Sequence, residues 1–350
     1  MSIAPLRTWP FVLFSVAVIT ALAGCTGATA PPPALSDEDR ALPTSMPSLP
    51  PVFYVDPTSP ANEQVARWEA EGRVEDAALL RRISERPTAK WPTGDQSTVR
   101  EQVAAFVTKA AIAGQMPVLV AHNIPERDCG RSTTGGARTA QAYQHWIREF
   151  AAGIAGRPVT VIVEPNAVAD AVAGCVKKTD VRYALLRDAV NVLKSTGSAR
   201  VYLDAGHPQW IKDLDELTHG LKRAGIELAD GFSLNVANFF RVEDNVEYGH
   251  RISDALGGNV SFVIDTSRNG NGPYPDETVR GAPSWCNPPG RALGPEPTDR
   301  TGLDRVDALL WIKYPGESDG ACRPGEPKIG HWWPEYALEL ARRSSAAAQG

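Results

Sequence analysis

The residues best suited to chemistry in this 350-residue chain are mostly carboxylates and amides, and each follows a short apolar run. They are Asp128, Glu164, Asn166, Asp204, Asn235, Asp265, Lys313, Glu317 and Asp319. Carboxyl groups can act as general acids and bases, and together with amides they hydrogen-bond hydroxyl groups. Any one of them could be an ordinary solvated loop residue, but a random set of loop starts would hold more Lys, Ser and Thr. The set therefore points to a polar, uncharged ligand that is rich in hydroxyls.

The apolar runs before these residues predict buried strands. The runs are 52–55, 118–121, 159–163, 201–203, 232–234, 261–264 and 308–312. Segments with helical periodicity lie between them, near 98–113, 139–155, 179–196, 211–224 and 243–256. This alternation is typical of the α/β class, with a parallel sheet covered by helices. We expect a single domain containing a distorted parallel β/α barrel of about seven strands, whose active face lies at the strand carboxyl ends.

Six segments with distinctive residues occur in a fixed order along the chain. They are Asn123–Gly130 with Gly135 and Gly136, Val161–Asn166, Tyr202–His207, Val263–Gly270, Trp285–Pro288 and Trp311–Gly320. In this order they resemble the signatures of glycoside hydrolase family 6, the inverting cellulases. The resemblance implies a distorted barrel that hydrolyses β-1,4-glucosidic bonds with inversion at the anomeric carbon.

The resemblance also assigns catalytic roles. Inversion needs an acid that protonates the leaving oxygen and a carboxylate that activates water. Asp319 matches the proposed base, which could work through a water chain, and Asp128 matches the aspartate that supports the acid. The acid itself ends a Glu-Pro-Asp triplet in the family, but in this chain that position is Asn166. A carboxamide cannot give up a proton at any relevant pH, and losing a general acid typically costs about 10²- to 10⁴-fold in rate.

A second departure lies beside the first, because the family places a tyrosine at the position of His122. That tyrosine helps to hold the distorted sugar. Two residues could replace the missing acid: Asp128 in a cleft of low dielectric constant, or His122, whose unperturbed pKa is about 6.5. Asp170 is expected to be a helix-start or surface residue.

Further positions match residues that contact the sugar chain. Lys313 and Glu317 match partners of sugar hydroxyls, and Asp204 and Asp265 match structural or substrate-orienting carboxylates. For these residues, ion pairs that fix the loops are the alternative. Asn235 is expected to bind substrate because it ends a predicted strand.

Three tryptophans match the indoles on which the family stacks glucose rings: Trp91, Trp210 and Trp285. An indole offers a flat apolar surface to the C–H face of a sugar. The tryptophans expected to be structural are Trp68, Trp146, Trp332 and Trp333.

The N-terminus predicts export. Residues 1–24 read as a signal peptide, and Leu22–Cys25 resembles the lipobox of bacterial lipoproteins, so we expect lipid on Cys25; a plain secretory signal is the alternative. Residues 25–51 are rich in Pro and small residues and are expected to form a stalk. The folded domain follows over 52–346. We therefore expect the protein to be lipid-anchored to the outer face of the cell membrane or secreted.

Four cysteines remain beyond Cys25, and an even number in an exported chain suggests disulfides. Three pairings are possible. We favour the sequential one, Cys129 with Cys175 and Cys286 with Cys322, which the family resemblance also implies. No cysteine or histidine spacing favours a metal site, and no motif calls for a cofactor.

Two functions stay open. The formal charge of −5 and the absence of a long Lys/Arg run argue against nucleic acid as a partner. The first hypothesis is an exported, monomeric glucanase with an open, endo-acting groove, in which Asp128 serves as surrogate acid. The second is a catalytically impaired surface lipoprotein that binds glucan. Asn166 is the residue that discriminates between them.

Overall fold

The computed structural model describes residues 52–94, 97–130 and 135–347. The predicted signal peptide, the predicted stalk and Cys25 lie outside these residues. The chain divides into one unit over residues 1–49 and another over 50–350, and the description below concerns the second. Among the described helices, none combines the length and the apolar character that a membrane span requires.

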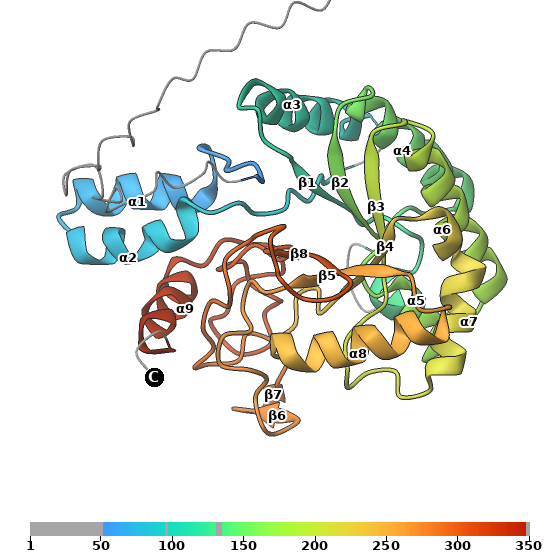
Figure 1. Ribbon diagram of the computed structural model, residues 1–350. Coiled ribbons are helices and arrows are strands. Elements are labelled where there is room, and N and C mark those ends of the chain that lie inside the picture. Colours follow the sequence, from blue (N-terminus) through green and yellow to red (C-terminus); the bar gives the residue numbers. More distant parts are fainter. Residues whose placement is uncertain (1–51, 95–96, 131–134, 348–350) are drawn as a thin grey trace, which may run out of the picture. The chain divides into compact units, whose positions relative to one another are not determined.

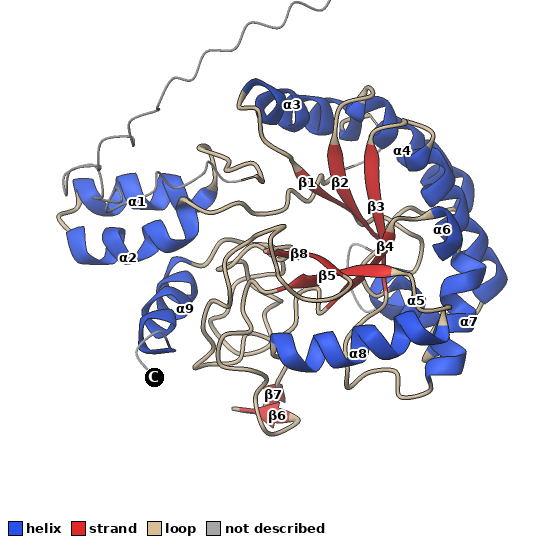
Figure 2. Cartoon of the chain, in the orientation of Figure 1, coloured by secondary structure: helices blue, strands red, loops and turns tan. Residues whose placement is uncertain are grey.

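Six parallel strands form the central sheet in the order β1-β2-β3-β4-β5-β8 (Figures 1 and 2). Their bounds are β1 Val118–Ala121, β2 Val159–Val163, β3 Ala199–Asp204, β4 Gly231–Leu234, β5 Ser261–Asp265 and β8 Val306–Leu310. Each strand pairs in parallel with its neighbour in this order. Six of the seven predicted strands are therefore present, and the expected α/β class and barrel type are confirmed.

Helices cover the outer face of the sheet (Figure 2). The five predicted ones are α3 Val99–Ile112, α4 Ala140–Ile154, α6 Thr179–Lys194, α7 Leu214–Ala224 and α8 Val242–Ala255. The sequence did not predict α1 Pro60–Ala70, α2 Val74–Ser84, α5 Ala167–Val172 and α9 Pro334–Ala347, nor the short elements η2 Arg127–Gly130, η3 Ile226–Leu228, β6 Thr278–Val279 and β7 Ala282–Pro283. Local chemistry fixes several ends. For example, the Asp213 side chain caps the first turn of α7, and Gly225 ends that helix with a φ of 92°.

Side chains of each strand alternate between two buried clusters. Along β1, Leu119 and Ala121 face the large cluster under the helices. Val118 and Val120 face a smaller inner cluster, which also contains Ile162 and other inward residues of the sheet. Because both faces are buried, the strands read as continuous apolar runs, and this is why the sequence reveals them.

The seventh predicted strand, 52–55, does not join the sheet as a ladder. Phe53 makes one isolated parallel bridge, to Met116 just before β1. The run is short and lies between Pro51 and Pro57, which have no N–H to donate to a ladder. The expected strand count is therefore corrected from about seven to six.

A different segment joins the two edges of the sheet. The backbone N–H of Ala89 donates to Trp311 O, just after β8, over 2.9 Å. The next residue, Lys90, donates to Val118 O in β1 and accepts from Val120 N, each over 2.9 Å. Residues 89–90 therefore connect β8 to β1 and help to enclose the inner cluster.

A satellite core lies beside the barrel. Helices α1 and α2 pack on each other, and α9 packs on α2. Buried Trp68, Leu80 and Leu340 meet there with Tyr314 and Tyr336. This core matters for the site because Tyr314 belongs to the loop after β8, and Tyr336 lies next to a buried arginine of the loop after β5.

Candidate active site

The predicted polar residues lie along the edge of the sheet that is formed by the carboxyl ends of the strands, because all six strands are parallel. β3 and β5 end at Asp204 and Asp265 themselves. His122 follows β1 directly, and Asn235 follows β4. The loops after β1, β2 and β8 carry the remaining predicted residues.

Two disulfides fix the loops at this edge, and the expected pairing is confirmed. Cys129–Cys175 ties the loop after β1 to the segment between α5 and α6, with a Cα–Cα distance of 5.5 Å. Cys286–Cys322 spans 6.5 Å between Cα atoms. Asp170 and Glu326 each lie near one of these bridges, but disulfide sulfurs offer no thiolate to a metal.

Asn166 and Asp128 meet beyond the carboxyl ends of β2 and β1. Nδ2 of Asn166 donates to Oδ1 of Asp128 over 3.1 Å, and its backbone N–H donates to Oδ1 of Asp204 over 2.8 Å. Among the described residues, no hydrogen bond reaches Oδ2 of Asp128, and none uses the second side-chain N–H of Asn166. The amide at the acid position is therefore held against the neighbouring carboxylate while keeping one donor available.

His122 lies on the other side of Asp128. Its Nε2 is 3.8 Å from Oδ1 of Asp128, and the Trp91 ring meets it edge-on at 5.3 Å. Burial lowers the pKa of His122 to about 4, with nearby cationic Arg127 and Lys313 contributing. The imidazole is then neutral near pH 7, so the structure argues against His122 as the replacement acid.

A buried carboxylate and a buried arginine hold the loop that carries His122 and Asp128. Glu164, fully buried, accepts from the backbone N–H groups of Asn123 and Ile124 over 2.9–3.0 Å. Arg182 donates to Pro125 O at 2.7 Å and to Glu126 O at 3.1 Å. Asn166 contacts Asp128 in the site. Glu164, two residues earlier, instead holds the backbone of the loop after β1.

We expect Glu164 to make stability depend on pH. Burial raises the pKa of Glu164 from 4.5 to about 7. A raised folded-state pKa means that the contribution is complete below pH 4.5 and is lost as pH rises through 7, an effect on the order of 3 kcal/mol. Glu164→Gln should therefore flatten the dependence of the unfolding free energy on pH between about 5 and 8 in urea titrations.

The exposed Glu247→Gln changes net charge equally and serves as the control. If the unfolding free energy depended on pH equally in the native chain and in Glu164→Gln, this prediction would be contradicted.

Three predicted substrate ligands are instead bonded within the protein. Asp265 accepts four backbone N–H bonds, from Ala237, Ser267, Ile312 and Lys313. Asp204 accepts from the backbone of Asn166 and Gly206 and from Ser233 Oγ. Asn235 donates to Phe240 O and Asp265 O and accepts from Phe240 N. All three are fully buried, so their roles here are to fix loops, and the expected substrate contact of Asn235 is not supported.

Asp319 is paired with a buried cation. Its Oδ2 accepts from Arg268 Nη1 at 2.8 Å and from the backbone N–H of Asn287 at 3.0 Å. Arg268 is fully buried, and its guanidinium lies 4.4 Å from the Phe239 ring centroid. Asp319 is thus fixed through Oδ2, while Oδ1 has no partner among the described residues.

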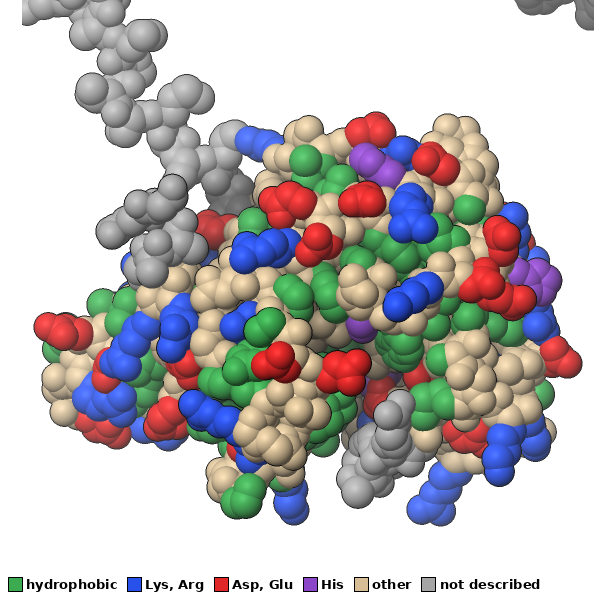
Figure 3. All heavy atoms as spheres, turned by 90° about the horizontal axis from the view of Figure 1, so that it is seen from below, with side chains coloured by type: hydrophobic (Ala, Val, Ile, Leu, Met, Phe, Trp, Pro, Cys, Tyr) green, Lys and Arg blue, Asp and Glu red, His purple; other side chains and the backbone are tan. Residues whose placement is uncertain are grey.

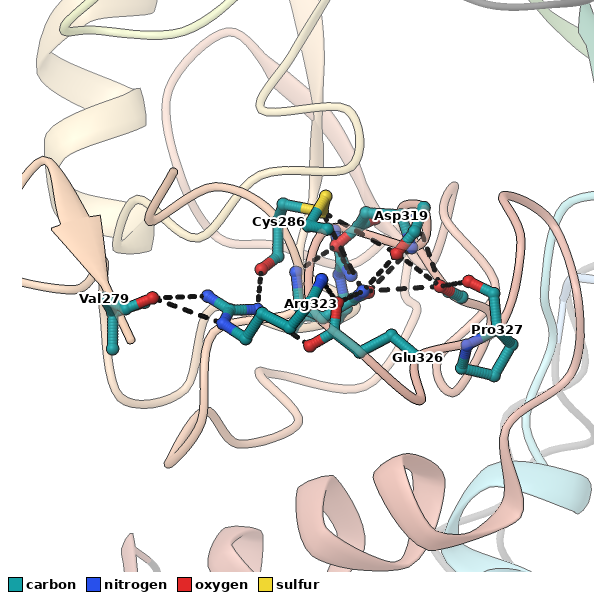
Figure 4. The surroundings of a disulfide bond; sticks show 11 residues. Val279, Cys286, Asp319, Arg323, Glu326 and Pro327 are labelled. Atoms are coloured by element: carbon teal, nitrogen blue, oxygen red, sulfur yellow. Dashed lines mark hydrogen bonds and ion pairs between the residues drawn. A yellow bond between two sulfur atoms is a disulfide. The ribbon is translucent and has the colours of Figure 1, made fainter. Parts of the chain in front are cut away.

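The Asn287 side chain organises the loop around Asp319, and Figure 4 shows Asp319, Arg323 and Glu326 of this loop beside Cys286. Its Oδ1 accepts from Asp319 N at 2.7 Å, and its Nδ2 donates to Gly320 O and to Glu326. Arg323 in turn donates to Glu326, to Cys286 O and to Val279 O. These bonds and the adjacent disulfide fix the position of Asp319.

Two further groups of residues lie beyond the strand carboxyl ends. Lys313 Nζ lies 3.4 Å from Glu317 Oε2 in the loop after β8. Beyond β3, His207 stacks on Phe240 at 4.8 Å and lies 5.5 Å from the Trp210 ring. Polar partners and flat apolar faces are therefore both present at the edge.

The three predicted platforms differ in exposure. Trp285 is 53% exposed, whereas Trp91 and Trp210 are partly buried. The Trp91 indole N–H donates to Ile312 O over 2.8 Å, which fixes its ring. Trp68 and Trp146 are buried, and Trp332 and Trp333 pack on the satellite core, as expected of structural tryptophans.

Left-handed backbone conformations concentrate at this edge. Asp128, Glu164, Asn166, Asn235 and Asn287 have φ values between 44° and 73°. Such conformations cost free energy for residues other than glycine and cluster at functional sites. Asn and Asp tolerate them best, so either residue fits at position 166.

Sequence reasoning missed four residues of the site. Arg268 and His207 lie inside the family-like segments and could have been singled out there. Arg182 and Phe240 carry no sequence signal, because their partners are distant in the chain. Asp170, expected at a helix start or on the surface, lies in the first turn of α5 and is only 1% exposed, so the first of these two alternatives is confirmed.

Comparison with known proteins gives a consistent result. Residues 51–344 match the family described as glycosyl hydrolases family 6. Endoglucanase A of Cellulomonas fimi is 44% identical over 294 residues, which cover 83% of this chain and 61% of that protein. Endoglucanase 1 of Streptomyces halstedii is 39% identical over 82% of this chain and 88% of its own length. This chain thus spans less than two thirds of the first of these relatives.

A solved structure is also similar. The endoglucanase Cel6 from Mycobacterium tuberculosis, in complex with methyl-cellobiosyl-4-deoxy-4-thio-β-D-cellobioside, superposes with a TM-score of 0.77 at 40% identity. The match covers 85% of this chain and 98% of that one.

Proposed function

This chain belongs to the glycosyl hydrolases of family 6, and on that premise we propose that it binds a β-1,4-glucan chain and hydrolyses it slowly, with inversion. The observation that carries this proposal is the contact between Asn166 and Asp128 at the strand carboxyl ends. We propose Asp319 as the base and the indoles of Trp91, Trp210 and Trp285 as sugar platforms, whereas the acid position holds an amide.

The proposed reaction uses Asp319 as base and Asp128 as surrogate acid. Oδ1 of Asp319 takes the proton of the attacking water, directly or through a second water. The proton for the leaving oxygen would come from Oδ2 of Asp128, the oxygen without a partner among the described residues. Lys313, Glu317 and the three indoles of Trp91, Trp210 and Trp285 are proposed to hold the sugar rings.

Glucan binding with little or no turnover is the second candidate. The observation that favours it is the hydrogen bond from the Asn166 side chain to Asp128, because it places a hydrogen-bond donor, and no acid, at the position from which the family protonates. On the face shown in Figure 3, charged side chains of both signs are interspersed with apolar ones.

We further propose that the protein works outside the cell, since two disulfides are stable in oxidising surroundings. The signal peptide over 1–24, lipid on Cys25 and a stalk over 25–51 would then place a monomeric domain at the membrane surface. No nucleic-acid partner is proposed.

Trp285→Ala tests the glucan-binding part. Since Trp285 is 53% exposed, we expect no loss of stability, but cellohexaose should bind about tenfold more weakly because a sugar ring loses its indole platform. Titration calorimetry measures this. The control is Ile112→Ala, since Ile112 is 83% exposed at the end of α3, away from the strand carboxyl ends.

Unchanged affinity for cellohexaose in Trp285→Ala would show that the Trp285 indole does not bind the glucan. If the native domain bound no β-1,4-glucan at all, the proposed function would be wrong.

A further inference from the structure

We propose that the native site hydrolyses β-glucosyl compounds whose leaving group departs as a stable anion, such as the β-glucosides of acidic phenols. This inference rests on the proposed function and names a substrate class for the same site. It follows from an amide at position 166 after β2 and a carboxylate at position 319 after β8, both beyond the carboxyl ends of strands of the same parallel sheet.

The Asn166 amide is held in place by hydrogen bonds, and one of its N–H groups remains available as a donor. Its backbone N–H is held by Asp204 at 2.8 Å, and one side-chain N–H is held by Asp128 at 3.1 Å. The other side-chain N–H has no partner among the described residues. An N–H can donate to an oxygen that becomes negative, and hydrogen bonds to anions are roughly twice as strong as neutral ones. Asn166 can thus stabilise a departing anion, although it cannot protonate an alkoxide.

The contacts that hold Asp319 in place do not involve Asn166. Asp319 is held by Arg268 and by the Asn287 backbone, and its Oδ1 is left without a partner among the described residues. Neither of these partners belongs to the loop that carries Asn166. Water activation should therefore be as effective in this chain as in one with aspartate at 166.

The step balances without a proton donor. The water oxygen bonds to the anomeric carbon, one water proton moves to Asp319, and the carbon–oxygen bond to the phenol breaks. The electron pair of that bond leaves with the phenolate oxygen, facing Asn166, and Asp319 then releases its proton to solvent. A sugar alkoxide is too basic to leave in this way, so the same site discriminates against plain glucan.

The test compares two substrates in three variants. The substrates are 2,4-dinitrophenyl β-cellobioside, whose phenolate leaves unprotonated, and cellotetraose, whose leaving sugar needs a proton. The variants are the native chain, Asn166→Asp and Asn166→Ala. We expect the native chain and Asn166→Asp to differ by about 10²- to 10⁴-fold on cellotetraose, but by no more than about tenfold on the aryl substrate. Asn166→Ala, which lacks the donor, should be about 10²-fold slower than the native chain on the aryl substrate.

The outcomes separate the two proposals. If the native chain shows the same deficit against Asn166→Asp on both substrates, or is no faster than Asn166→Ala on the aryl one, this inference is overturned while the proposed function stands. If Asn166→Asp cleaves neither substrate although it is folded, the proposed function itself fails. Native activity that is much higher on the aryl substrate than on cellotetraose supports the inference.

Discussion

Asn166→Asp should raise the turnover of cellotetraose by about 10²- to 10⁴-fold, because it puts a proton donor back at the position from which the leaving oxygen is protonated. The new carboxyl group would face Asp128, whose charge favours the protonated form of its neighbour. The backbone needs no change, since aspartate also tolerates the φ of 73° found at this position. Turnover is measured by product formation, and proton NMR should show the α-anomer forming first.

Asn191→Asp is the matched control, because it adds the same charge at an exposed position on α6. It should leave turnover unchanged. An Asn166→Asp variant that binds cellotetraose but cleaves no faster than the native chain would show that the loss of activity lies elsewhere in the site. Native turnover that disappears in Asp128→Ala would support Asp128 as the surrogate acid; native turnover that survives this change would refute it.

The sequence predicts the sheet well because each strand is buried on both faces. The run at 159–163 is continuous and β-branched, and it matches β2 residue for residue. Residues 89–90, which connect β8 to β1, show what the sequence does not predict. Ala89 and Lys90 make only a few backbone bonds, to partners such as Trp311 and Val118 that are distant in the chain. Two residues carry no periodicity, so no pattern could reveal their position.

The site was predictable in position but not in role. A residue that ends a parallel strand must lie at the carboxyl edge, so Asp204 and Asp265 were found. Whether such a carboxylate faces substrate or backbone depends on the course of other loops. Asp265, for example, accepts from Lys313, whose backbone N–H is 48 residues away in the chain. Sequence alone could not separate these supports from Asp128, which keeps an oxygen without a partner among the described residues.

Removing Asp319 should reduce stability as well as catalysis. Its partner Arg268 is fully buried, so Asp319→Ala leaves a charge in the interior without its counter-ion, at a cost of about 3–5 kcal/mol. Urea unfolding measures this. The control is Glu227→Ala, which breaks the exposed ion pair between Arg187 and Glu227 and should cost less than about 1 kcal/mol. Equal losses in the two variants would contradict the prediction.

Because stability and catalysis change together in Asp319→Ala, a lost activity there does not identify the base. The double variant Arg268→Met/Asp319→Leu separates the two effects, since it removes the buried charge and fills the space with apolar side chains. In the Asn166→Asp background, we expect the double variant to recover most of the lost stability. Its turnover should stay about 10²- to 10⁴-fold below that of Asn166→Asp. If turnover returned together with stability, Asp319 would be a structural partner of Arg268, and the attacking water would have to be activated by another group.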